Sequence, residues 1–231
     1  KMVFARNVLA HVANTHDFVD GLRASLADDG VLAIETHYAK NILEGLQYDS
    51  IYHEHLCYFS LKSVERLLGG HGLYVFDIMR SVISGGGIVV YAKKNKGEPS
   101  EAVLQYRAEE EKIGVNVFPS WEGFAARSFE HREKLLRILN AAKESGDTLV
   151  GWGASARSST LLNFCGIDSK ILPAIIDLNP LNQGRYTAGT HIPIQNPEAG
   201  MQRSPKTIFI LAWNFAEEIM EMIKNRYGFT G

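Results

Sequence analysis

The sequence has few cysteines, no long apolar run and little net charge. Only Cys57 and Cys165 occur among its 231 residues, and they stand far apart in apolar surroundings. This excludes a disulfide framework and a thiolate zinc site, and a reduced, cytoplasmic protein is expected. No apolar run approaches the roughly 18 residues of a membrane span, and we expect no signal peptide. The formal charge of -2 offers no basic footprint for nucleic acid.

Up to about residue 95, the chain alternates between helical and strand patterns. Apolar spacing predicts helices over 16–30 and 61–72, the second capped by Ser60. Strands are predicted in the following ranges: 3–12 with its turn, 31–36, and an antiparallel edge pair at 73–80 and 87–94. Residues 36–58 show little periodicity. So long an irregular connection is usually functional.

The composition changes at KKNKGEPS, and the apolar spacing of residues 100–146 predicts nearly continuous helix. Within this range, Pro119 must either start a new helix or break one. The buried-face candidates of this helical bridge are Trp121, Phe124, Phe129, Leu135, Leu136 and Leu139. Strands and helices alternate again from residue 148, which predicts a parallel, Rossmann-like sheet. The expected domains are 1–97, 98–146 and 147–231.

The segment GWGASA follows a predicted strand and opens a predicted helix, where glycine-rich phosphate loops occur. An ordinary tight turn also favours glycine. Asp177 ends the next strand, where a dinucleotide-binding protein holds the ribose. The loop 182–194 is either a ligand contact or a plain excursion closed by a short edge strand. The candidate binding residues of this half are Gly151, Gly153, Ser155, Arg157 and Arg185.

The stretch IYHEHLCYFS contains the most chemically suggestive residues. A zinc site built from its histidines with His11, His16 and His37 is worth testing, but the sequence has no H-E-x-x-H pattern. We therefore expect no metal. Acid–base chemistry fits better, because histidine titrates near neutral pH and an adjacent tyrosine or carboxylate can orient it. An extended chain would place Tyr52 and Glu54 on the face opposite His55, so their convergence requires a bend.

These motifs, taken together, resemble a known family. The segments NVLAHVANTHDFV, GVLAIET, YDSIYHEHLCYFS, GWGASARSSTLLNFCGI, IIDLNPLNQGRYTAGTHIPI and ILAWNFAEEI occur in the order found in S-adenosylmethionine-dependent sugar C-methyltransferases. Members of that family act on nucleotide-linked ketosugars. The resemblance covers essentially the whole chain. It implies the C-terminal part of a class I methyltransferase sheet, followed by a smaller Rossmann-like domain.

The resemblance implies that His55 is the general base, that Tyr52 and Glu54 line the sugar site, and that His11 shares the pocket. The base would remove a proton next to a ketone, and the enolate would attack the sulfonium methyl group. His11 or Tyr52 would then hold the enolate oxygen. Ala5 to Asn7 would be the remaining contact with S-adenosylmethionine.

The sequence departs from the family pattern in two places. A zinc-binding cysteine region and a glycine-rich cofactor loop are expected before the first strand, so we interpret the chain as a fragment that is inactive in isolation. Ala156-Arg157-Ser158-Ser159 stands where the family favours a Lys-Gly-Asn type of sequence. Two rival functions remain open. One is a nicotinamide-dependent oxidoreductase built on GWGASA and Asp177, and the other is a non-catalytic nucleotide-sugar binding protein.

Overall fold

A computed structural model describes residues 1–82 and 85–230 of the chain. Residues 83 and 84, in the predicted link between two strands, and Gly231 lie outside this description. The chain divides into two compact units. The first comprises Lys1–Gln47 and His53–Ala125, and the second comprises Tyr48–Tyr52 and Ala126–Gly231. The predicted α/β class with Rossmann-like sheets is confirmed. The three predicted domain ranges stay a prediction.

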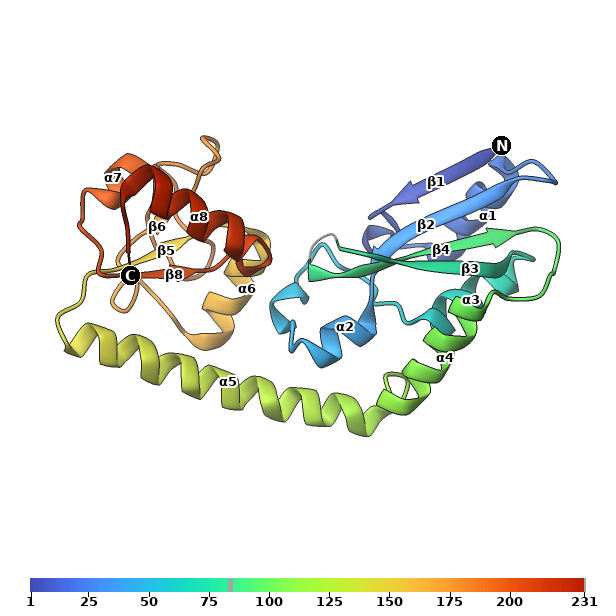
Figure 1. Ribbon diagram of the computed structural model, residues 1–231, viewed down its shortest axis with the longest axis horizontal. Coiled ribbons are helices and arrows are strands. Elements are labelled where there is room, and N and C mark those ends of the chain that lie inside the picture. Colours follow the sequence, from blue (N-terminus) through green and yellow to red (C-terminus); the bar gives the residue numbers. More distant parts are fainter. Residues whose placement is uncertain (83–84, 231) are drawn as a thin grey trace. The chain divides into compact units, whose positions relative to one another are not determined.

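The first unit is built on a four-stranded sheet with the order β1-β2-β4-β3 (Figure 1). Its strands are β1 (Met2–Arg6), β2 (Val31–His37), β3 (Tyr74–Ser81) and β4 (Gly87–Lys93). β1 runs parallel to β2, whereas β4 pairs antiparallel with both β2 and β3. The predicted antiparallel pair at the sheet edge is therefore confirmed.

Three helices cover one face of this sheet: α1 (Thr15–Ser25), α3 (Leu61–Gly70) and α4 (Glu101–Ile113). Ser60 caps α3 as predicted, in a capping box with Ser63. The core between sheet and helices contains Leu9, Val19, Leu32, Ile34, Leu61, Val64, Leu68, Ile88, Val90 and Val103, among others. Strand residues that alternate with this core point to the opposite face, where Met2, Phe4 and Met79 are exposed.

The prediction of an irregular segment over 36–58 is wrong in part. Residues 39–44 form the helix α2 (Ala39–Glu44), and residues 48–50 form the 3-10 turn η2 (Tyr48–Ser50). Ile42 and Leu43 bury their side chains, so a single helical turn and a half suffices to anchor the segment. So short a helix offers too few residues for its apolar period to stand out in the sequence.

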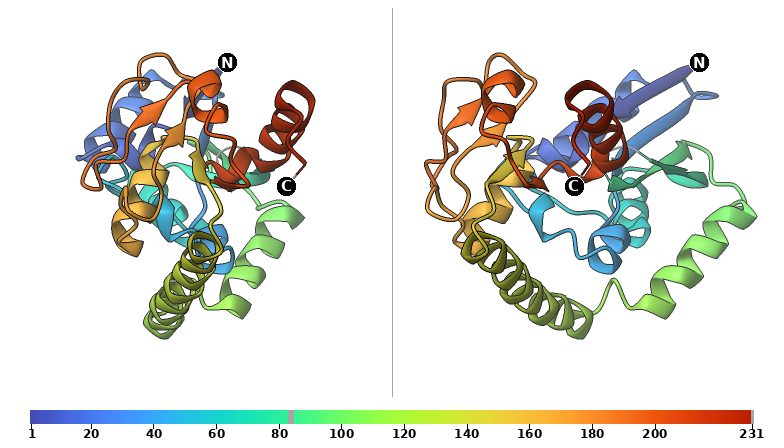
Figure 2. Two further views of the ribbon diagram at one scale, coloured as in Figure 1. Left: turned by 90° about the vertical axis from the view of Figure 1, so that its left-hand side faces the viewer. Right: turned by 60° about the vertical axis from the view of Figure 1, so that its left-hand side comes forward.

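Helix α5 (Phe118–Glu144) begins one residue before Pro119, which therefore starts the helix as predicted. It is a single uninterrupted helix in each of the further views (Figure 2). Phe124 and Leu139 are buried as expected, but Phe129 is 54% exposed and was wrongly assigned to the buried face. At 100° per residue, Phe129 is turned well away from the stripe formed by Phe124, Ser128 and Leu139.

The second unit contains a four-stranded sheet with the order β7-β6-β5-β8, and all its pairs are parallel. The strands are β5 (Leu149–Trp152), β6 (Ile175–Ile176), β7 (Ile194–Gln195) and β8 (Thr207–Ile210). Its other elements are α6 (Ala156–Cys165), α7 (Pro197–Met201), η4 (Trp213–Phe215) and α8 (Ala216–Tyr227). Helix α8 packs Ile219 and Ile223 against Val150 and Trp152. None of the helices in the described ranges combines the length and apolar character that crossing a bilayer requires.

A buried carboxylate fixes the start of α3 in the first unit. Glu110 on α4 is 2% exposed and accepts hydrogen bonds from Leu61 N–H at 2.5 Å and Lys62 N–H at 3.2 Å. Asn116 Nδ2 also donates to it at 3.0 Å. The first amides of a helix have no partner within the helix and carry partial positive charge, so a carboxylate here is favourable.

We predict that Glu110→Ala lowers the free energy of unfolding by about 2–3 kcal/mol, because two buried helix-start amides lose a charged acceptor. Denaturant unfolding followed by circular dichroism measures this. Glu111→Ala on the exposed side of the same helix is the matched control and should change stability by less than about 0.5 kcal/mol. Equal effects of the two variants would contradict the assignment.

Candidate active site

The segment that carries His55 is hydrogen-bonded to the first unit at both ends. The chain turns at residues 52–54, as the predicted convergence required. The backbone N–H groups of Leu56 and Cys57 both donate to the carbonyl oxygen of Ala10, at 2.8 and 3.2 Å. Further along, Phe59 O accepts from Ala39 N–H at 2.8 Å. The segment is therefore held between η1 (Leu9–His11) and the start of α2.

Three histidines and a tyrosine gather around the middle of this segment. His55 is 6% exposed, and its ring centroid lies 4.5 Å from that of His37, 5.0 Å from His11 and 6.2 Å from Tyr58. The His11 Nδ1–H donates to the backbone oxygen of Glu54 at 2.8 Å. A carbonyl only accepts, so this bond leaves Nε2 of a neutral His11 as an acceptor.

The structure brings together two of the four predicted catalytic side chains, His55 and His11. Glu54 is exposed and contributes its backbone carbonyl to the cluster. Tyr52 is half-buried and belongs to the second unit. Ile51 and Leu56 are 45% and 52% exposed, so the apolar residues of this run do not all enclose the histidines. The catalytic roles of all four side chains stay predictions.

His37 and Tyr58 are the members of this cluster that sequence reasoning did not assign to catalysis. His37 is the last residue of β2, and the carboxyl end of a parallel strand is where α/β proteins place functional residues. The place of His37 at the end of a predicted strand could therefore have marked it as a candidate site residue. Within the described ranges, no group of three or more His, Cys, Asp or Glu side chains is arranged to hold a metal ion.

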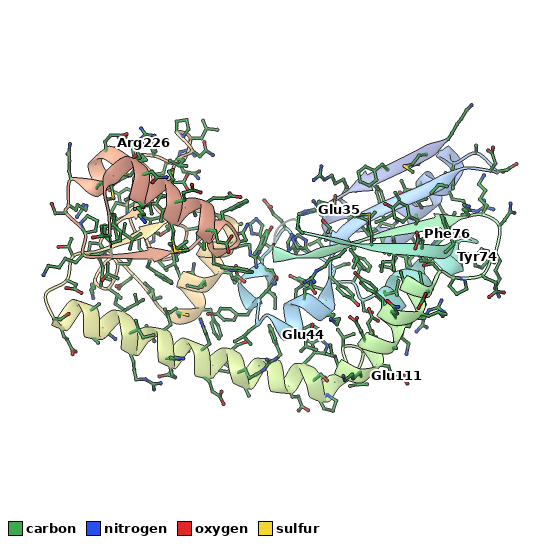
Figure 3. All side chains as sticks on the ribbon, viewed as in Figure 1. Glu35, Glu44, Tyr74, Phe76, Glu111 and Arg226 are labelled. Carbon is green, nitrogen blue, oxygen red and sulfur yellow. The ribbon has the colours of Figure 1, made fainter. Side chains whose placement is uncertain are left out.

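The carboxyl ends of β1 and β2 meet beside this cluster in the sheet. Asn7 follows β1 with a φ of 49°, and its N–H donates to Glu35 O at 2.9 Å. The Glu35 side chain, labelled in Figure 3, is buried and is paired with Arg6 Nε at 2.8 Å and Ser81 Oγ at 2.5 Å. Ala5 is 7% exposed and packs its methyl group in the core.

In the second unit, the glycines of GWGASA are explained by close packing. A Cβ on Gly151 would lie 2.9 Å from Ile175 Cγ1 and 3.0 Å from Leu172 Cδ2. Gly153 has a φ of +99°, and a Cβ there would lie 2.6 Å from Ala212 Cβ. Both residues therefore have structural reasons to be glycine, and a ligand role for them stays a prediction.

The donors of this loop are used within the protein. Ala154 N–H donates to Asp177 Oδ2 at 2.6 Å, and Asn179 N–H donates to Oδ1 at 2.7 Å. Ser155 caps α6 in a capping box with Ser158. Both oxygens of Asp177 thus accept hydrogen bonds from backbone amides, whereas in a nicotinamide enzyme this carboxylate would bind the ribose of the cofactor. The oxidoreductase interpretation therefore loses its main support.

The two predicted substrate-binding arginines differ in their surroundings. Arg157 Nε and Nη2 donate to the buried Asp49 carboxylate at 2.8 and 3.0 Å. Arg185 is exposed in the loop 182–194, which the short edge strand β7 closes as predicted. Its exposed side chain is accessible to a ligand, and its role in substrate binding stays a prediction.

Comparison with known proteins agrees with this architecture. Residues 82–230 match the family model described as a C-methyltransferase C-terminal domain, and residues 1–78 match a methyltransferase domain. The chain belongs to the C-methyltransferase family. It is 34% identical over 223 residues to the C-methyltransferase NovU of Streptomyces niveus, an alignment that covers 96% of this chain and 53% of NovU. The chain thus spans about half the length of this curated relative.

Methyltransferase domains of this kind imply S-adenosylmethionine as the methyl donor. Ligands of open α/β sheets bind outside the carboxyl ends of the strands. Asn7 is partly accessible just beyond β1, so its position fits such a contact, whereas Ala5 fits through its backbone alone. Both roles stay predictions.

We predict that Gly153→Ala lowers the free energy of unfolding by about 2–4 kcal/mol, because it combines a left-handed φ with a clash against Ala212. Gly166→Ala has a similar φ of +68° and no neighbouring atom within 4 Å, so it should cost only about 1–2 kcal/mol. Denaturant unfolding compares the two. Equal losses would show that the close approach to Ala212 carries no energy.

Proposed function

We propose that the protein of which this chain forms part transfers a methyl group from S-adenosylmethionine to a carbon atom of a nucleotide-linked ketosugar. Membership of the C-methyltransferase family supports the reaction class. The single observation that carries the chemistry is the buried His55, in ring contact with His37 and His11 and held in place by hydrogen bonds of the flanking backbone.

In the proposed mechanism, His55 removes a proton from the carbon next to the ketone of the sugar. The carbonyl acidifies that proton, and a histidine near neutrality is a suitable acceptor. The electron pair of the C–H bond moves to form an enolate. When bound, S-adenosylmethionine would supply an electrophilic methyl group. The enolate carbon would form a bond to it as the sulfur–methyl bond breaks, and the electron pair of that bond would stay on sulfur, which leaves as the neutral thioether of S-adenosylhomocysteine.

A donor must hold the enolate oxygen as its charge develops. His11 is one candidate, and its bond to Glu54 O fixes how it would act. With Nδ1–H donating to that carbonyl, His11 offers a proton to substrate at Nε2 only when it is a cation. Tyr52 is the other candidate, since a phenol donates in its ordinary neutral state. We propose Tyr52 and Glu54 as sugar contacts.

The burial of His55 would also keep water away from the reacting atoms. His55 is nearly inaccessible from the solvent, and the backbone carrying it is fixed on both sides by pairs to Ala10 and Ala39. A base that is preorganised in this way loses little entropy when substrate binds, which favours proton transfer from a weakly acidic carbon.

We predict that His55→Asn in the full-length protein lowers kcat for methyl transfer to a ketosugar by about 10²- to 10⁴-fold, because a general base typically contributes that much. The dissociation constant for S-adenosylmethionine should stay unchanged. In D₂O, the wild-type protein should also exchange the acidic proton of the sugar, and the variant should not.

His16→Asn is the matched control, since it removes an exposed imidazole of the same unit that lies on α1 outside the cluster. It should retain wild-type rates. Undiminished methyl transfer or proton exchange by His55→Asn would remove the proposed base.

A further inference from the structure

We infer that Asp49, Arg157 and Trp213 form a clamp that positions Tyr52, and that Arg157 acts as a positioning residue. This inference rests on the proposed function, because Tyr52 is a proposed sugar contact. All four residues belong to the second unit, in which Tyr48–Tyr52 is a separate stretch of chain packed with residues 126–231.

The carboxylate of Asp49 is the centre of the clamp. It is 4% exposed and accepts two charge-assisted hydrogen bonds from Arg157, one on each oxygen. Trp213 Nε1–H donates to Oδ2 at 2.7 Å. The carboxylate thus receives two hydrogen bonds from α6 and one from η4, so two elements far apart in the sequence fix one side chain of the segment.

The guanidinium of Arg157 is occupied on its edge and on its face. Its edge grips Asp49, and its face lies 4.7 Å from the centroid of the Trp213 ring. Stacking on an aromatic ring and bidentate pairing with a carboxylate are the two interactions that arginine makes best. A substrate phosphate would have to displace Asp49 to be bound in the same way.

The rest of the segment is tied to α6 and α5. Tyr48 OH lies 3.0 Å from His131 Nδ1 on α5 and 3.6 Å from Cys165 Sγ on α6. Burial raises the pKa of Tyr48, which keeps its hydroxyl protonated in this position. Thr160 Oγ1 donates to Ile51 O at 3.4 Å. Tyr48, Asp49 and Ile51 therefore each have a contact with α5, α6 or η4.

Tyr52 follows directly on this fixed stretch, three residues after Asp49. Fixing the backbone at residue 51 and the side chain at residue 49 leaves few orientations for the next residue. Placing a reacting group to within about 1 Å can change a rate by about 100-fold, so the clamp offers a reason for the second unit to affect catalysis without binding substrate through Arg157.

The test compares Arg157→Met with Arg226→Met in the full-length protein. Arg226, which Figure 3 labels, is a matched control because its contacts are an exposed ion pair with Glu198 and a cation–π contact with its neighbour Tyr227, both away from Tyr48–Tyr52. Hydrogen–deuterium exchange by mass spectrometry reports on Tyr48–Tyr52, and steady-state kinetics report on methyl transfer.

For Arg157→Met we expect at least a tenfold rise in exchange over Tyr48–Tyr52 and a fall in kcat of about 10- to 100-fold. KM for S-adenosylmethionine should change by less than about twofold. Arg226→Met should change neither measurement. Asp49→Asn can keep one acceptor oxygen for Arg157 Nε and Trp213 Nε1 and loses the acceptor for Arg157 Nη2, so it should lose less activity than Arg157→Met. The double variant Asp49→Asn/Arg157→Met should resemble Arg157→Met, because both changes act on one interaction.

Two results would overturn the clamp. One is unchanged exchange in Arg157→Met, above all if KM for the sugar rises, since Arg157 would then bind substrate. The other is raised exchange with undiminished kcat, which would leave the clamp without a catalytic role. If Arg157→Met fails to fold, Trp213→Phe removes one donor and keeps an aromatic ring for stacking, and the same two measurements apply.

The outcome for the clamp is independent of the outcome for the base. His55→Asn should leave exchange over Tyr48–Tyr52 at the wild-type level. Should that variant keep full activity, the proposed base fails, yet the exchange of Arg157→Met still decides whether the clamp holds the segment.

Discussion

The carbonyl oxygen of Ala10 is the constraint on which the candidate site depends. It accepts from two successive amides, those of Leu56 and Cys57, and the chain next forms a bridge at Phe59, with Tyr38. The carbonyl oxygen of Ala10, in the 3-10 turn η1, therefore holds the backbone next to His55 and restricts the orientation of the His55 side chain. A second hydrogen bond, from the His11 side chain to the carbonyl oxygen of Glu54, joins the same two segments in the opposite direction. Because backbone groups make these bonds, the arrangement tolerates side-chain change around it better than a site assembled from side chains alone.

Buried acids recur throughout both units, and each one is matched by donors fixed in the backbone or in a rigid side chain. Glu110 receives the first amides of α3, Glu35 receives Arg6 and Ser81, and Asp49 receives Arg157 and Trp213. An unmatched carboxylate in these places would carry a large desolvation cost. These paired carboxylates hold helices and strands in one register, whereas apolar contacts alone would allow the helices and strands to shift relative to one another.

The sequence predicted the periodic parts of this fold well, for definite physical reasons. The capping serine at Ser60, the helix start at Pro119 and the strand-to-helix turn at Gly151–Ser155 are local signals, and each has one dominant conformation. The family resemblance added the order of the units and the interest in His55. The prediction for Phe129 is wrong because it rests on apolar character alone, whereas the position of this residue lies well away from the buried stripe of the helix. The contacts of Asp49 and His37 were beyond prediction, since their partners are distant in the chain and obey no spacing rule.

The assignment of Tyr48–Tyr52 to the second unit has a consequence for how such a protein can evolve and be dissected. A polypeptide cut at residue 126 would yield a C-terminal piece that lacks a stretch buried among its own helices. The Asp49 carboxylate would leave with the other piece, and the Arg157 cation would remain in a largely enclosed pocket without its counter-ion. Residues 126–231 are therefore not expected to form an independent folding unit without the Tyr48–Tyr52 stretch. Recombination could exchange it between relatives only together with the five-residue stretch that lies far upstream in the gene, which ties the inheritance of the Rossmann-like unit to that of the histidine motif.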